Sequence, residues 1–176
     1  VTGFLSLRKR QVRKSYWVGY ENIGGGCQQT SSLNVWKRMK TDKPFFDSNV
    51  LLYLLSEDKH KADRAEAIIA LGGVISVQVL NEFASVASRK LAMTYAEIRE
   101  ILATVRAICQ TQPVTIDTHD LGLDIAERFG FSLYDSLIVS AALQSGCNIL
   151  YSEDMQHGQE INAQLVIRNP FHKKEL

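Results

Sequence analysis

The chain has 176 residues, of which 45% are hydrophobic, and its 20 Lys and Arg residues nearly balance its 19 Asp and Glu residues. This length and composition indicate one globular domain with some additional chain. No apolar run reaches the roughly 18 residues that a membrane span needs, so a membrane protein is excluded. The three cysteines form no CxxC pair and the first residues do not resemble a signal peptide, so we expect a cytoplasmic protein.

Positive charge is concentrated at the start of the chain. Residues 1–40 contain eight basic residues and one acidic residue, whereas residues 41–176 contain 12 basic and 18 acidic residues. The sequence therefore predicts a basic, irregular extension at 1–38, a compact domain at 39–172 and a short tail at 173–176. Because Met39 stands where the compact part begins, we expect residues 1–38 to be an upstream extension without its own function. The alternative is an arm whose basic and aromatic side chains bind RNA.

Short apolar runs alternate with amphipathic stretches in the compact part. Helices are predicted at 50–55, 61–71, 79–90, 95–109, 118–129 and 134–145, and strands at 45–46, 74–77, 113–116, 148–151 and 165–167. Asp47, Ser48 or Asn49 would be the N-cap of the first helix. This alternation predicts an α/β fold with three layers and a parallel sheet of about five strands.

Four acidic residues stand near the predicted carboxyl ends of strands, where ligands bind in α/β folds. They are Asp47, Glu82, Asp135 and Asp154. Helical periodicity puts Glu82 and Asp135 at the border of the apolar face of their helices. Carboxylates held against apolar surface repel one another unless a cation neutralises them. Oxygen ligands without a His or Cys cluster favour Mg²⁺ or Mn²⁺.

Each of these acids also has a simpler interpretation. Asp47 is a possible helix N-cap, and Asp135 fits a capping pattern that begins at Ser132. Glu82 is a possible half-exposed helix residue, and Asp154 a possible turn residue. Tyr134 lies in the apolar arc of its helix and is predicted to be a core residue. The occurrence of all four acids at strand ends favours the metal site.

Four segments resemble the PIN-domain ribonucleases, most closely the VapC-like toxins of bacterial toxin–antitoxin pairs. The segments are FFDSNVLLY at 45–53, SVQVLNE at 76–82, LYDSLI at 133–138 and LYSEDMQHG at 150–158. The resemblance runs in order from about residue 44 to 171, and residues 1–38 have no counterpart in it. It implies a PIN-like α/β/α domain, an acidic pocket for Mg²⁺ or Mn²⁺, and endonucleolytic cleavage of RNA. It also implies a cognate antitoxin partner and a homodimer.

The motif positions assign the same four acids as catalytic residues and metal ligands, with Asp47 and Asp135 as the principal ligands. Glu153 competes with Asp154 because the two are adjacent, and the motif position favours Asp154. Ser48 and Asn49 would hydrogen-bond the ligands or a substrate phosphate. One or two bound ions remain possible.

A metal held by carboxylates activates water for phosphodiester cleavage without a nucleophilic Ser or Cys. One alternative is a non-catalytic RNA-binding or regulatory PIN domain. Another is a Mg²⁺-dependent phosphatase-like fold, which expects a second Asp where Asn49 stands.

Overall fold

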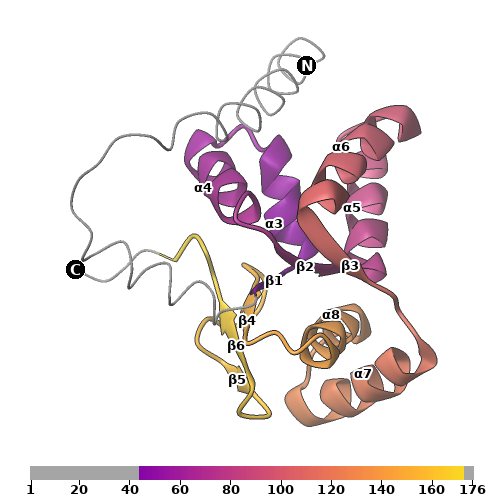
Figure 1. The fold of residues 1–176 in the computed structure, drawn as a ribbon, viewed down its shortest axis with the longest axis vertical. Coiled ribbons are helices and arrows are strands. Elements are labelled where there is room, and N and C mark those ends of the chain that lie inside the picture. The colour runs from indigo at the N-terminus through magenta and orange to yellow at the C-terminus, as the bar shows by residue number, and fades with distance from the viewer. Residues whose placement is uncertain (1–43, 173–176) are drawn as a thin grey trace, which may run out of the picture. The chain divides into compact units, whose positions relative to one another are not determined.

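The computed structural model describes residues 44–172, which form a mostly parallel sheet of six strands with helices on both faces (Figure 1). The strands are β1 (Pro44–Phe46), β2 (Gly73–Ser76), β3 (Cys109–Gln112), β4 (Ile149–Tyr151), β5 (Glu160–Ile161) and β6 (Leu165–Arg168). Their order is β3-β2-β1-β4-β6-β5, and only the pairing of β5 with β6 is antiparallel. The predicted α/β fold is confirmed, and its unpredicted sixth strand is the two-residue β5.

The helices divide between the two faces of the sheet. They are α3 (Ser48–Leu52), the short 3₁₀ helix η1 (Tyr53–Leu55), α4 (Lys59–Ile69), α5 (Val77–Lys90), α6 (Tyr95–Ile108), α7 (Ile116–Phe129) and α8 (Leu133–Gln144). Figure 1 shows α7 and α8 on one side of the sheet and α3 to α6 on the other. Right-handed crossovers require this division, because the chain moves outward from β1 to β3 and then returns to β4.

The predicted strand at 113–116 is wrong. The strand is β3, which ends at Gln112 and pairs with β2, and its polar sequence concealed it because it lies at the edge of the sheet. Pro113 has no backbone N–H with which to continue the ladder. Helix α7 begins soon afterwards because Thr115 and Thr118 form a capping box, each side chain accepting from the other residue's backbone N–H.

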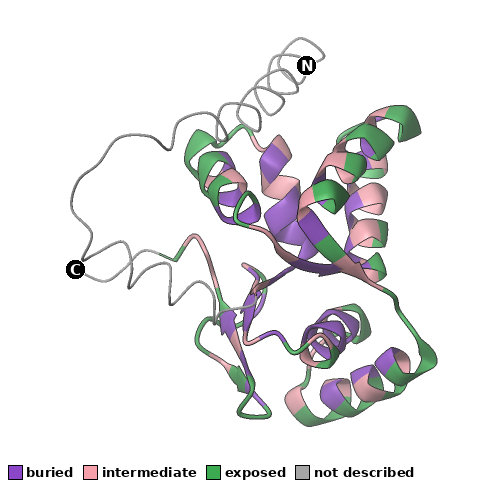
Figure 2. Ribbon diagram, viewed as in Figure 1, coloured by how far each residue is buried: buried purple, intermediate pink, exposed green. Residues whose placement is uncertain are grey.

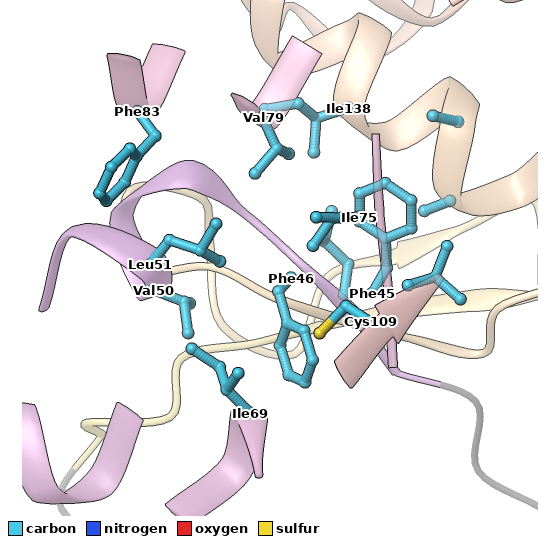
Figure 3. Close-up of a cluster of buried hydrophobic side chains, with 14 of the residues drawn as sticks. Phe45, Phe46, Val50, Leu51, Ile69, Ile75, Val79, Phe83, Cys109 and Ile138 are labelled. Atoms are coloured by element: carbon cyan, nitrogen blue, oxygen red, sulfur yellow. The ribbon is translucent and has the colours of Figure 1, made fainter. Parts of the chain in front are cut away.

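Two adjacent phenylalanines of β1 anchor the core on opposite faces of the sheet. Successive side chains of a strand alternate between faces, and both Phe45 and Phe46 are fully buried. Figure 3 shows the ring of Phe46 extending toward Ile69 of α4 and Phe45 lying beside Ile75 of β2. A Cβ at Gly73 would lie 2.5 Å from a ring carbon of Phe46, so the neighbouring strand requires glycine there.

Helix α8 is buried over most of its length, including the seven consecutive residues 136–142 (Figure 2). Helix α7 covers it closely enough that a Cβ at Gly122 would lie 3.0 Å from Leu137. The first turn is different, and Tyr134 is 62% exposed. The prediction that Tyr134 belongs to the core is wrong, because a helix that is apolar all round has no single face from which burial of its first turn follows.

No helix among residues 44–172 is long and apolar enough to cross a membrane. The predicted extension at 1–38 and the tail at 173–176 lie outside the described residues.

Candidate active site

The candidate site lies at the carboxyl ends of β1 and β4, the two central strands. The chain runs from β1 to β2 in one direction and reaches β4 on the other side, which makes this position the switch point of the sheet. Phe46 pairs with Tyr151, so Asp47 and Ser152 follow at the same level. The backbone N–H of Asp47 donates to the carbonyl of Tyr151 at 3.0 Å, which fixes this alignment.

Asp47 is the most deeply buried of the predicted acids, with 2% of its surface exposed. It is the N-cap of α3, and the backbone N–H of Ser48 donates to its Oδ1 at 2.5 Å. Its Oδ2 accepts from Asn49 Nδ2 at 2.9 Å and from Ser152 Oγ at 2.6 Å. The simpler capping role is therefore real, and three donors hold the carboxylate in one orientation.

The electrostatic setting of Asp47 is unfavourable to its charge. Its pKa is raised from 3.8 to about 7, mainly by burial and to a smaller extent by the negative charges of Glu82 and Asp135. Hydrogen bonds from Ser152 and Ser48 oppose this change without cancelling it. A cation bound beside Asp47 would lower the pKa of this carboxyl group again, because a positive charge favours the ionised carboxylate.

Glu82 lies in α5, which begins after Ser76, the N-cap whose hydroxyl accepts from the N–H of Val79. Glu82 is half-buried, and its Oε2 accepts from Ser48 Oγ at 2.7 Å. Its Oε1 accepts from Gln78 Nε2 at 2.8 Å, one helical turn earlier. Because Ser48 also contacts Asp47, this serine links two of the predicted acids.

The adjacent acids after β4 have separate partners. Asn49 Nδ2 donates to Oδ2 of Asp154 at 3.1 Å, so Asp154 shares a partner with Asp47. Glu153 instead forms an ion pair with Lys61 at 2.6 Å. The structure thus places Asp154, which is exposed, at the edge of the candidate site and directs the side chain of Glu153 to α4.

Asp135 lies in the first turn of α8 and is half-buried. Its Oδ2 accepts from Ser132 Oγ at 2.7 Å, and its backbone N–H donates to that same hydroxyl at 3.2 Å. The capping interaction predicted from the sequence is therefore present. Its influence on the pKa of Asp47 also identifies Asp135 as an electrostatic neighbour of the candidate site.

Three polar residues hold the side chains of Asp47, Glu82 and Asp154 in place. Ser48 and Asn49 are buried, and their side chains are directed to Asp47, Glu82 and Asp154. Ser152 was missed by sequence reasoning, although it is fully buried and donates to Asp47. The sequence did indicate this residue indirectly, because Ser152 directly follows the central strand β4. The residues that follow β4 and β1 lie at the same edge of the sheet.

The donor chemistry of the site fits a hard divalent cation, because its four acids offer only oxygen ligands. Within the described range, however, no three His, Cys, Asp or Glu side chains are gathered tightly enough to hold an ion as they stand. An ion would have to draw the partly exposed carboxylates of Glu82, Asp135 and Asp154 closer to Asp47. Glu82 and Asp154 each already share a hydrogen-bond partner with Asp47, namely Ser48 and Asn49.

Solved structures that resemble the chain include the following three. One is the VapC20 toxin of Mycobacterium tuberculosis, described as cleaving the sarcin–ricin loop, with 17% identity, a TM-score of 0.53 and coverage of 62% of this chain and 88% of that one. A toxin–antitoxin complex from Klebsiella pneumoniae has 16% identity, a TM-score of 0.57 and coverage of 74% and 100%. FitAB bound to an IR36 DNA fragment has 14% identity, a TM-score of 0.54 and coverage of 75% and 98%. At these identities the likeness shows a shared fold.

No curated protein matches the sequence significantly. The family model of the PIN domain matches residues 45–159, which include the carboxyl ends of β1, β2 and β4 and the start of α8. That match covers more than half of the chain. Together with the mostly parallel sheet and its switch point between β1 and β4, it shows that the chain belongs to the PIN-domain family.

Proposed function

We propose that the chain is a metal-dependent endoribonuclease, with Asp47, Glu82, Asp135 and Asp154 as its catalytic acids. The observation that carries this proposal is the buried Asp47, whose neighbours include further carboxylates and whose pKa is raised to about 7. The N-cap role of Asp47 needs a hydrogen-bond acceptor, which a neutral Asn or Ser also provides, so capping does not account for the negative charge. Its position at the switch point of a PIN-domain sheet supports a catalytic purpose.

The side chains of the site would bind the cation and orient the attacking water. Asp47 and Asp135 are the proposed principal ligands of Mg²⁺ or Mn²⁺, while Glu82 and Asp154 would bind a second ion or orient the attacking water. Bound beside them, the cation would lower the pKa of a water molecule and stabilise charge on the scissile phosphate. Ser48 Oγ and Asn49 Nδ2 donate to these carboxylates and limit their rotation. We assign both residues to this orienting role.

We further propose that the enzyme is a toxin neutralised by a cognate antitoxin protein. Support comes from the similar structures, which include a toxin described as cleaving the sarcin–ricin loop and a toxin–antitoxin complex. A cytoplasmic location and a homodimer are part of this proposal. The family match favours a nuclease over the phosphatase-like alternative, and activity measurements separate the nuclease from a non-catalytic RNA-binding PIN domain.

Cleavage of a structured RNA by the full chain tests the proposal. Cleavage should require Mg²⁺ or Mn²⁺, stop with EDTA, and be lost in Asp47→Ala and Asp135→Ala. Asp117→Ala is the matched control, because Asp117 is an exposed acid in the first turn of α7, as Asp135 is in the first turn of α8. Cleavage that is indifferent to EDTA or to both site substitutions would exclude the metal-dependent mechanism.

A further inference from the structure

A cluster of charged and aromatic side chains lies beside the candidate site without belonging to it. Lys61 Nζ pairs with Oε1 of Glu153 at 2.6 Å, and the hydroxyl of Tyr53 donates to Oε2. Lys61 also donates to the hydroxyl of Tyr53 at 2.9 Å. Both oxygens of Glu153 are therefore occupied by partners on η1 and α4.

The ammonium group of Lys61 is held from a second direction. It lies 4.5 Å from the centre of the Tyr53 ring and 5.4 Å from the centre of the Phe171 ring. The two rings meet edge to face with their centres 4.6 Å apart. The side chain of Lys61 retains 29% exposure and that of Glu153 24%, so the pair is partly shielded from water. Such shielding makes the attraction stronger than that of a fully exposed ion pair.

The backbone around Glu153 is attached to the candidate site. The N–H of Glu153 donates to Asn49 Oδ1 at 3.4 Å, and Asn49 Nδ2 donates to the side chains of Asp47 and Asp154. The N–H of Asp154 donates to Ser152 Oγ at 3.2 Å. The segment 152–154 is thus held by Asn49 on one side and by the Lys61 cluster on the other. Glu153 is therefore held through its backbone by Asn49 and through its side chain by Lys61, and Asp154 follows it directly in the chain.

We propose that Lys61 is a positioning residue that holds Glu153 outside the acid cluster, so that Asp154 is the acid of this segment that faces Asn49 and Asp47. This inference rests on the proposed function. Without Lys61, Glu153 would lose its cationic partner, and two adjacent carboxylates would compete for the same edge of the site. Tyr53 and Phe171 support the role by restraining the ammonium group.

Two measurements on the full chain test this role. In the metal-free protein, the side-chain amide resonance of Asn49 reports on its contacts with Asp47 and Asp154. Lys61→Met should shift it, whereas Lys59→Met, an exposed position in the same first turn of α4, should not. Titration with Mn²⁺ alone should show affinity weakened by about 10-fold in Lys61→Met, the lower end of the cost of losing an outer-shell partner, because Lys61 acts on Asp154 only through Glu153. Lys61→Arg should recover most of that affinity, because it keeps the charge.

The outcomes separate this inference from the proposed function. If Asp47→Ala abolishes Mn²⁺ binding while Lys61→Met leaves it unchanged, the positioning role is overturned and the metal site stands. If the parent protein does not bind Mn²⁺, the proposed metal site fails. The Asn49 amide then decides the positioning role alone, and an unshifted resonance in Lys61→Met overturns it. A Lys61→Arg variant as weak as Lys61→Met would also contradict a role that depends on charge.

Discussion

Asp47 and Glu153 are acids that follow the two central strands at the same edge of the sheet, yet their surroundings are opposite. Asp47 is buried among neutral donors and other acids, and its pKa is raised to about 7, mainly by burial. Burial also acts to raise the pKa of Glu153, but hydrogen bonds from Lys61 and Tyr53 and the charge of Lys61 outweigh it and lower the pKa. Of these two acids, Glu153 has a cationic partner, Lys61, and Asp47 has none among the described residues.

The difference is between a charge that is neutralised by a partner within the described fold and one that is not. The ion pair of Glu153 stabilises its ionised form without any ligand. The ionised form of Asp47 has only neutral hydrogen-bond donors against the charges of Glu82 and Asp135. A carboxylate left in this condition gains most from an added cation. The comparison therefore predicts a graded set of mutational effects.

The largest contrast is expected in catalysis. Asp47→Asn should lower RNA cleavage by more than about 100-fold, because even outer-shell partners of a metal site cost 10- to 100-fold. Glu153→Gln should lower it by about 10-fold at most. Single-turnover rates with saturating Mn²⁺ would measure both. Equal losses in the two variants would break the distinction between these acids.

The pH dependence of stability should carry the signature of Asp47. Its pKa is higher in the folded protein than its ordinary value of 3.8, so the folded state binds more protons between about pH 4 and pH 7. The free energy of unfolding of the metal-free protein should therefore fall as pH rises through this window, by up to a few kcal/mol. Urea titrations with EDTA should show this slope in the parent and a flatter slope in Asp47→Asn. Mn²⁺ should restore stability at pH 8.

Two buried serines provide a contrast in hydrogen bonding. Ser152→Ala removes a 2.6 Å hydrogen bond to Asp47 and should cost about 1–3 kcal/mol of unfolding free energy. Ser136 Oγ is buried with no hydrogen-bond partner among the described residues, so Ser136→Ala should be neutral or stabilising by about 1 kcal/mol. Chemical denaturation at pH 6 measures both. A destabilised Ser136→Ala variant would show that its hydroxyl has an unrecognised role.

The smallest effect concerns the stability provided by Glu153. Its pKa is lower in the folded protein, so its contribution is present at neutral pH and is lost as pH falls through the folded pKa. Glu153→Gln should reduce stability at pH 7 by no more than about 1 kcal/mol, because the pair with Lys61 is partly exposed. The difference from the parent should shrink below about pH 4. A constant difference down to pH 2 would contradict the ion-pair explanation.

Local sequence patterns were sufficient for most elements of the fold. Apolar runs such as that at Phe45 and Phe46 identified the central strands, and helix caps such as Ser132 marked where helices begin. Apolar runs and helix caps involve residues close together in the sequence, so they can be recognised without knowing which distant segments pack against them. The pattern failed for β3, where pairing with β2 at the sheet edge stabilises a polar strand, and for Tyr134, whose exposure depends on what covers the first turn of α8.

The sequence by itself determined the α/β class and the candidate acids, because periodicity and strand-end position are local properties. Only the tertiary structure decided which side chains Glu153 and Asp154 contact, since Lys61 and Asn49 lie about a hundred residues earlier in the chain. It also revealed Ser152, whose contact with Asp47 depends on the register between β1 and β4. Burial and charge around Asp47 likewise arise only when distant segments meet, which is why its raised pKa has no signature in the sequence.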